Sequence, residues 1–278
     1  MVAAVGWVFG YFTGFGWFGL GLAIAVSIGM SFLSYYASDK IVLGISRARP
    51  ADPHVHARYL NIVEGLSIAA GIPKPRAYVI EDAAPNAFAT GRNPEHGAIA
   101  VTTGLLEKMN RVELEGVIAH ELAHIRNYDI RVATIAVVLA GVVVLLSDWL
   151  LRAMWWGGRR ARGSGGLAIG AGIAAIGLVL ALLSPIFAQM IKAAVSRRRE
   201  GLADVTAVEL TRYPPGLIQA LKKLQDDRTV VRTASHATAH LWIESPLDRE
   251  GSGAGAWFNR LFDTHPPIQE RIAALEAV

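Results

Sequence analysis

The sequence predicts a multi-pass membrane protein that is mostly α-helical, with a small β-sheet inside one α+β domain. Of its 278 residues, 53% are hydrophobic and only 18% are charged, and the mean hydropathy is +0.36. These values exceed the usual apolar content of a soluble domain. The excess lies in three hydrophobic stretches, one at the N-terminus and two on either side of an Arg-rich loop. A β-rich region between residues 76 and 102 predicts the sheet.

The first hydrophobic stretch, residues 1–38, contains no Asp, Glu, Lys, Arg or His. As one helix it would measure roughly 57 Å at ~1.5 Å per residue, nearly twice the ~30 Å hydrocarbon core of a bilayer. We therefore expect a hairpin that is broken near Gly14–Gly16. Its first arm would have only about 13 residues, fewer than the ~20 of a full crossing. We expect this arm to be re-entrant or to begin upstream of Met1.

The expected sheet follows residue 75. Arg76–Glu81 and Gly97–Thr102 alternate apolar and polar residues or are rich in β-branched ones, and Asn86–Gly91 lies between them. This pattern is typical of short strands joined by turns. It predicts a small sheet directly before the next helix.

That helix carries the most informative string of the chain, His120-Glu121-Leu122-Ala123-His124. Asn110 and Glu113 form a capping-box pattern, which predicts the start of the helix. The i, i+4 spacing places both imidazoles on one face, where they can bind one metal ion with Glu121 beside them. The sequence has no Cys, so a zinc site must use His, Asp and Glu. Three such ligands with an open fourth position are typical of catalytic zinc.

Two further hydrophobic stretches, 132–151 and 163–191, are each long enough for one crossing. If the metal has a ligand beyond them, both ends of this pair lie on one side of the bilayer. Basic residues near the membrane are more numerous on that side, which favours a cytoplasmic domain by the positive-inside rule. The four Arg residues of the loop between the stretches oppose this, and a shallow hairpin is the alternative. The basic residues fit anionic lipid headgroups, so we expect no nucleic-acid partner.

A second pair of charged residues at i, i+4 follows the last hydrophobic stretch. Glu200 and Asp204 share one helix face, so one can bind zinc while the other accepts a hydrogen bond from an imidazole. The alternative is a pair of solvated carboxylates that pair with Arg197–Arg199. His236 and His240 also lie at i, i+4 but lack the adjacent Glu, and a metal there would contradict the first assignment.

Taken together, these motifs resemble those of HtpX, a family of membrane-bound zinc endopeptidases of the gluzincin group that is related to the CAAX-prenyl endopeptidases. The resemblance covers the chain from about residue 30 to 278 in matching order. Its motifs are Pro85–Gly91, His120-Glu121-x-x-His124, Glu200-x-x-x-Asp204, Thr264-His265-Pro266-Pro267 and Arg271-Ile272.

The resemblance implies a gluzincin-like domain that holds one Zn²⁺ per chain through His120, His124 and Glu200. Glu121 would be the general base that activates water at the zinc, and Asp204 would accept a hydrogen bond from a ligating His. Asn127 and Asp129, just past the motif, are expected to close the helix end; a contact with the ligands is the alternative.

The resemblance also implies roles around the substrate. His265 would stabilise the oxyanion of the reaction, with capping or structural burial as the alternative, and Arg271 would orient the site. An exposed edge strand would bind a peptide substrate by main-chain hydrogen bonds, a mode with little sequence selectivity. Its residues would be Asn86, Ala87, Phe88 and Ala89.

We therefore expect four parts: N-terminal membrane segments (1–38), a catalytic part with the sheet and the motif helix (39–131), a hydrophobic helical pair (132–195) and a C-terminal catalytic part (196–278). The expected function is zinc-dependent endoproteolysis of damaged or misassembled membrane proteins, a form of protein quality control, at the cytoplasmic side of the cell membrane. The expected partners are polypeptides and the lipid bilayer. The alternatives are a non-peptidase zinc hydrolase and a non-catalytic membrane scaffold.

Overall fold

The computed structural model describes residues 21, 25, 29, 32, 35–37, 39–132, 197–227, 229, 231, 242–243 and 266–277. The chain divides into two compact units. One comprises Met1–Tyr36 and Val138–Met190, and the other comprises Ala37–Val137 and Ile191–Val278. The elements described below belong to the second unit, which is mostly helical with a small mixed sheet.

The hydrophobic stretches that we expect to enter the membrane lie outside the described residues, apart from single positions before residue 38 and Val132. Within the part of the chain that is described, no helix combines the length and the apolar content that a bilayer crossing requires. The multi-pass arrangement therefore stays a prediction.

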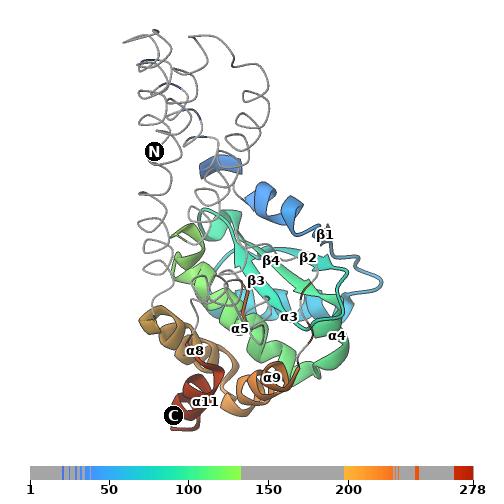
Figure 1. Ribbon diagram of the computed structural model, residues 1–278, viewed down its shortest axis with the longest axis vertical. Helices are drawn as coiled ribbons and strands as arrows, with labels where there is room; N and C mark the ends of the chain where they lie inside the picture. Colours follow the sequence, from blue (N-terminus) through green and yellow to red (C-terminus); the bar gives the residue numbers. More distant parts are fainter. Residues whose placement is uncertain are drawn as a thin grey trace, which may run out of the picture. The chain divides into compact units, whose positions relative to one another are not determined.

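Four strands form the sheet in the order β1-β2-β4-β3. They are β1 (Arg49–Pro50), β2 (Arg76–Ile80), β3 (Ala87–Thr90) and β4 (Ala98–Thr102). β2 and β4 run parallel, whereas β1 and β3 are antiparallel to their neighbours. The region from 76 to 102 thus forms a sheet as its sequence predicts, with β3 at one edge (Figure 1).

Alternate side chains of the sheet enter two different cores, as the two-residue period of a strand requires. Ala87, Ile99 and Val101 pack with helices α3 (Ala57–Ala70) and α5 (Arg111–Arg126) in the larger core. On the opposite face, Phe88 and Ala100 pack in a smaller core with Trp242. Both faces of β3 and β4 are therefore buried.

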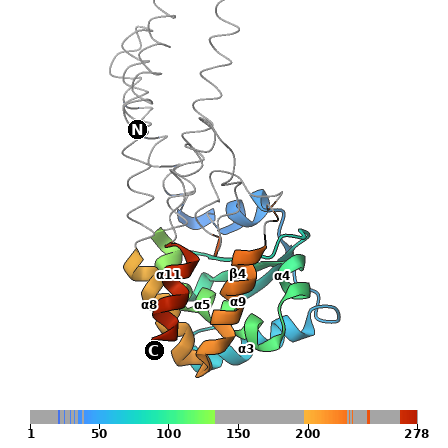
Figure 2. The same ribbon diagram turned by 60° about the horizontal axis from the view of Figure 1, so that its bottom comes forward.

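Helix α5 is the centre of this unit. It lies between the sheet and the helices α8 (Arg197–Thr211) and α9 (Pro214–Asp226), and α11 (Ile268–Glu276) packs against both of these (Figures 1 and 2). The predicted capping box is confirmed: Asn110 Oδ1 accepts from Glu113 N at 3.0 Å, and Glu113 Oε2 accepts from Asn110 N at 2.8 Å. Satisfying these amides fixes where α5 begins, and so which residues face α8.

Two glycines let α5 and α9 approach closely. A Cβ atom at Gly116 would lie 2.7 Å from Leu217 N, and one at Gly216 would lie 2.7 Å from Val112 O. Both neighbours are backbone atoms, which cannot turn aside as a flexible side chain can. The contact of α9 with the motif helix thus depends on the absence of side chains at this crossing.

We expect Gly116→Ala to destabilise the protein by about 1–3 kcal/mol, because overpacking forces the backbone of α9 away. The matched control is Gly65→Ala in α3, where a Cβ meets nothing within 4 Å. That change should instead stabilise by roughly 0.5–1 kcal/mol, since Ala favours a helix over Gly. Thermal unfolding of the two purified variants checks the opposite signs; a Gly116→Ala protein as stable as wild type would contradict the close contact.

Candidate metal centre

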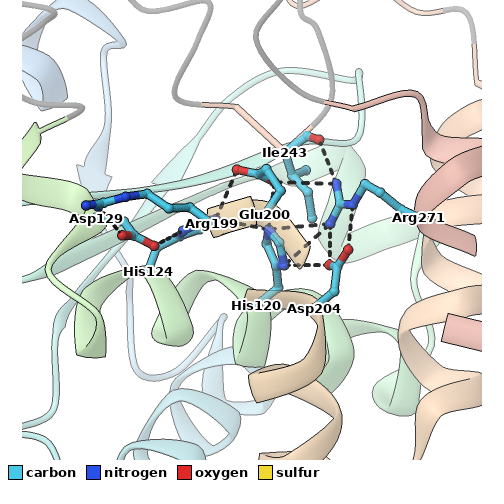
Figure 3. Close-up of polar contacts among 8 residues, drawn as sticks. All are labelled: His120, His124, Asp129, Arg199, Glu200, Asp204, Ile243 and Arg271. Atoms are coloured by element: carbon cyan, nitrogen blue, oxygen red, sulfur yellow. Dashed lines mark hydrogen bonds and ion pairs between the residues drawn. The ribbon is translucent and has the colours of Figure 1, made fainter. Parts of the chain in front are cut away.

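Three potential metal ligands from two helices converge at one point. His120 and His124 lie one turn apart on α5, and Glu200 lies in the first turn of α8 (Figure 3). The Nε2 atoms of the two imidazoles are 3.1 Å apart. Glu200 Oε2 lies 3.6 Å from His120 Nε2, and its Oε1 lies 3.6 Å from His124 Nε2. The chain thus brings together residues that are 80 positions apart in sequence.

These separations fit a small cation that binds nitrogen and oxygen. Tetrahedral zinc with bonds of about 2.0–2.2 Å holds neighbouring ligand atoms about 3.4 Å apart, and the three measured separations lie close to that value. Among the described residues, this trio is the group of His, Asp and Glu whose ligand atoms lie within 4.8 Å of one another. The donor set of two imidazoles and one carboxylate is also a known catalytic zinc set.

Asp204 and Arg271 complete one side of the site. Asp204 Oδ1 lies 2.9 Å from His120 Nδ1, opposite the nitrogen that faces Glu200. Arg271, from α11, forms a two-pronged ion pair with this carboxylate: Nε donates to Oδ2 at 2.9 Å and Nη2 donates to Oδ1 at 2.7 Å. Its Nη1 also donates to Ile243 O at 3.5 Å and lies 4.0 Å from Glu200 Oε2. Arg271 therefore ties α11 to the carboxylates of Asp204 and Glu200 on α8.

The buried charges of this cluster shift one another's pKa. Burial, and then the charge of Arg271, act to lower the pKa of His120, but the carboxylates of Asp204 and Glu200 outweigh them and raise it to about 9. Burial acts to raise the pKa of Asp204, yet Arg271 and His120 hold it at about 2. The pocket thus stabilises positive charge between its carboxylates, which is the electrostatic condition for binding a divalent cation.

Glu121 is buried beside the ligands, with 2% of its surface exposed. Its negative charge also affects the pKa of Arg271. Burial acts to lower the pKa of that guanidinium, and the surrounding carboxylates reverse the effect and raise it; in order of effect they are Asp204, Glu200 and Glu121. A buried carboxylate directly after His120 that acts on Arg271 fits the base expected next to the first His of the motif.

Asp129 has a contact that the sequence did not favour. Asn127 closes the end of α5 as expected, but the Asp129 carboxylate lies 3.0 Å from His124 Nδ1 and is paired with Arg199 (Figure 3). The available signal was its position, five residues after His124, where a turn can return a side chain to the helix end. Nothing in the sequence distinguished Arg199 from the two arginines before it.

The expected substrate strand is correctly an edge strand of the sheet but is not exposed. Asn86–Ala89 is at most 5% exposed at any residue. Trp242 packs edge-on against Phe88, with ring centroids 4.8 Å apart, and Ile243 N donates to Ala87 O at 3.0 Å. The prediction of an exposed strand was wrong because residues more than 150 positions away cover it.

Three predicted or alternative residues, His236, His240 and His265, lie outside the described residues. The roles assigned to them stay predictions. Pro266-Pro267 leads directly into helix α11, whose Arg271, Ile272 and Leu275 are buried.

A family model and curated relatives both match this chain over most of its length. The model of peptidase family M48 matches residues 53–278. A protease HtpX homolog of Thermoanaerobacter pseudethanolicus is 43% identical over 99% of this chain and 90% of its own length. A second, from Listeria innocua, is 47% identical over 92% of this chain and 86% of its own.

A solved structure supports the fold. The crystal structure of S. mikatae Ste24p matches 94% of this chain with a TM-score of 0.50 and 17% sequence identity. The chain covers 58% of the length of that protein. At this identity the likeness concerns the fold.

Proposed function

The chain belongs to peptidase family M48 and is a metalloprotease related to the HtpX proteases, and from this premise we propose that it is a zinc-dependent endopeptidase. One observation carries the proposal: His120, His124 and Glu200 bring two nitrogens and a carboxylate within 3.6 Å of one another. Family membership alone would not identify which residues bind the metal.

Zinc bound at these residues would supply a Lewis acid that polarises the peptide carbonyl and brings the pKa of a bound water toward ~7. Glu121 then accepts a proton from the attacking water and passes it to the leaving amine, which requires a carboxylate next to the ligands. Asp204 accepts a hydrogen bond from His120 Nδ1 and so keeps the Nε2 lone pair directed at the metal. Arg271 holds Asp204 in place through its two-pronged pair.

The substrate strand remains part of the proposal in a revised form. β3 has no neighbouring strand on one side, and there the Ala87 carbonyl accepts a hydrogen bond from Ile243 N. A peptide that pairs with β3 as an added strand has to replace this hydrogen bond. We propose that substrate binding displaces Ile243 from the edge of β3.

Membrane proteins are the proposed substrate class. The hydrophobic stretch 132–151 begins six residues after α5 ends, and the stretch 163–191 ends six residues before α8 begins. If both enter the bilayer, the site lies near its surface, and membrane-bound polypeptides reach it at a raised effective concentration. A cytoplasmic site rests on the positive-inside rule, and a role in removing damaged membrane proteins rests on the resemblance to HtpX.

Removal of the metal tests the proposal. We expect purified protein to contain one zinc per chain and to cleave casein, and chelation to bring cleavage to background because the three ligands alone cannot polarise the carbonyl. One equivalent of Zn²⁺ should restore cleavage. Mg²⁺ is the control and should not, because it prefers octahedral oxygen ligands. Casein cleavage that persists in metal-free protein would refute a zinc mechanism, and zinc-loaded protein that cleaves neither casein nor membrane proteins would favour a different zinc hydrolase.

A further inference from the structure

Each imidazole of the proposed zinc site contacts a carboxylate of its own through Nδ1. His120 Nδ1 lies 2.9 Å from Asp204 Oδ1, and His124 Nδ1 lies 3.0 Å from Asp129 Oδ2. In both residues the other ring nitrogen, Nε2, faces Glu200 (Figure 3). The two histidines are thus held in the same way, although only Asp204 belongs to the Glu-x-x-x-Asp motif.

Each of the two carboxylates is in turn held by an arginine. Arg271 binds both oxygens of Asp204. Arg199 donates from Nη1 to Asp129 Oδ1, so that the two oxygens of Asp129 serve Arg199 and His124 separately. Arg199 directly precedes Glu200 on α8. The end of α5 is therefore joined to α8 next to the third ligand.

The backbone between His124 and Asp129 is turned sharply to make this contact. α5 ends at Arg126 with Asn127 as its cap, and Tyr128 follows with φ 61°. This left-handed conformation costs a residue other than Gly roughly 1–2 kcal/mol. The Tyr128 side chain is half exposed, so its own burial does not compensate for the cost. The turn brings the next residue, Asp129, to within 3.0 Å of His124 Nδ1.

His124 needs such support more than His120 does. The side chain of His120 is 1% exposed and is held by packing on all sides, whereas that of His124 is 15% exposed. A ring with a free side can turn about its χ angles unless a hydrogen bond fixes it. A carboxylate at Nδ1 fixes both the ring orientation and the tautomer, which leaves the Nε2 lone pair for a metal.

We propose that Asp129 is a positioning residue for the zinc ligand His124, and that Arg199 holds Asp129 in place. The inference rests on the proposed function in that His124 is taken as a zinc ligand. It differs from a helix-capping role in its consequence: loss of the carboxylate weakens metal binding and alters the geometry of the site, whereas loss of a cap lowers only the stability of the fold.

The experiment measures metal affinity rather than proteolysis. Metal-free wild type, Asp129→Ala and Asp129→Asn are titrated with Zn²⁺ against a chromophoric chelator. We expect Asp129→Ala to bind zinc about 10–100-fold more weakly, the usual effect of removing the partner of a ligating His. Asp129→Asn keeps the shape and one acceptor oxygen but lacks the charge, and should fall between the two. Arg199→Gln should weaken binding in the same direction but less.

Cobalt and a control variant separate positioning from structure. With Co²⁺ in place of zinc, the visible absorption of Asp129→Ala should differ from wild type, because a turned His124 changes the ligand field. The matched control is Asp227→Asn, whose carboxylate pairs with Lys108 and Thr229 instead of a ligand. It should leave zinc affinity and the cobalt spectrum unchanged.

These measurements distinguish an absent zinc site from a zinc site in which Asp129 has no positioning role. Wild type that binds neither Zn²⁺ nor Co²⁺ would refute the proposed zinc site itself. Wild type that binds zinc while both Asp129 variants match it within threefold, with the same cobalt spectrum, would overturn only the role of Asp129. Lower thermal stability of metal-free Asp129→Asn with unchanged zinc affinity would likewise assign Asp129 to the helix end alone.

Discussion

Glu121→Gln should abolish most peptide-bond cleavage while leaving the metal site filled. The amide has the size of the carboxylate but cannot accept and deliver a proton, so the general-base contribution of roughly 10²–10⁴-fold is lost. At ~1.36 kcal/mol per factor of ten, this corresponds to about 3–5 kcal/mol of barrier. The residue lies beside the proposed ligands without being one of the three that converge. Single-turnover cleavage of casein, with zinc content measured on the same sample, checks both parts.

The control for this variant is Glu115→Gln on the same helix. Glu115 forms an exposed ion pair with Arg111 one turn earlier, and such pairs contribute little. Its activity should stay within twofold of wild type. If Glu121→Gln cleaved casein as fast as wild type does, the water-activating role would be wrong. If wild type and Glu115→Gln hydrolysed a non-peptide ester but not casein, a non-peptidase hydrolase would be the better assignment.

Local signals in the sequence account for what could be predicted. The capping box at Asn110 and Glu113 uses groups three residues apart, so its sequence pattern is nearly its structure. The same holds for the i, i+4 spacings, which place His120 and His124 on one face of α5, and Glu200 and Asp204 on one face of α8. The sheet between residues 76 and 102 could also be predicted, because apolar and polar residues tend to alternate along a strand.

Contacts between distant segments could not be read in this way. The covering of β3 by Trp242 and Ile243 depends on a chain segment that carries no periodic pattern of its own. The pairing of Asp129 with Arg199 needs α5 and α8 to meet at one crossing. Arg199 itself stands in a run of three arginines, and sequence gives no reason to distinguish it from Arg197 or Arg198. Which of three like charges faces inward is decided by helix packing.

The hydrophobic stretches were predicted from their composition, and not from a periodic pattern or from contacts. A charge-free run of 38 residues indicates burial in an apolar medium but not how the run is divided. The assignment of crossings, like the roles of His236, His240 and His265, stays a prediction.

Glu200→Ala should remove the metal altogether, which is the largest effect that we expect on binding. Removing even an outer partner of a ligating His weakens metal binding by about 10–100-fold, so loss of one of only three protein ligands should weaken it more. The protein should then be isolated without zinc and without activity. Because Glu200 is buried among other carboxylates, Glu200→Gln is the companion variant: it keeps the volume and relieves like-charge repulsion, so the metal-free protein should remain folded.

Zinc content distinguishes this assignment from its rivals. Glu209→Ala removes an exposed carboxylate of the same helix α8 and should keep a full complement of zinc, as should Glu121→Gln. Only the Glu200 variants should be empty. Zinc retained at one per chain in Glu200→Ala would require another third ligand, and zinc lost on changing His236 or His240 instead would move the metal to that pair. Because Glu200 follows the hydrophobic pair (132–195) and His120 and His124 precede it, a metal lost with Glu200 would also mean that the centre forms only after both halves of the catalytic unit have come together.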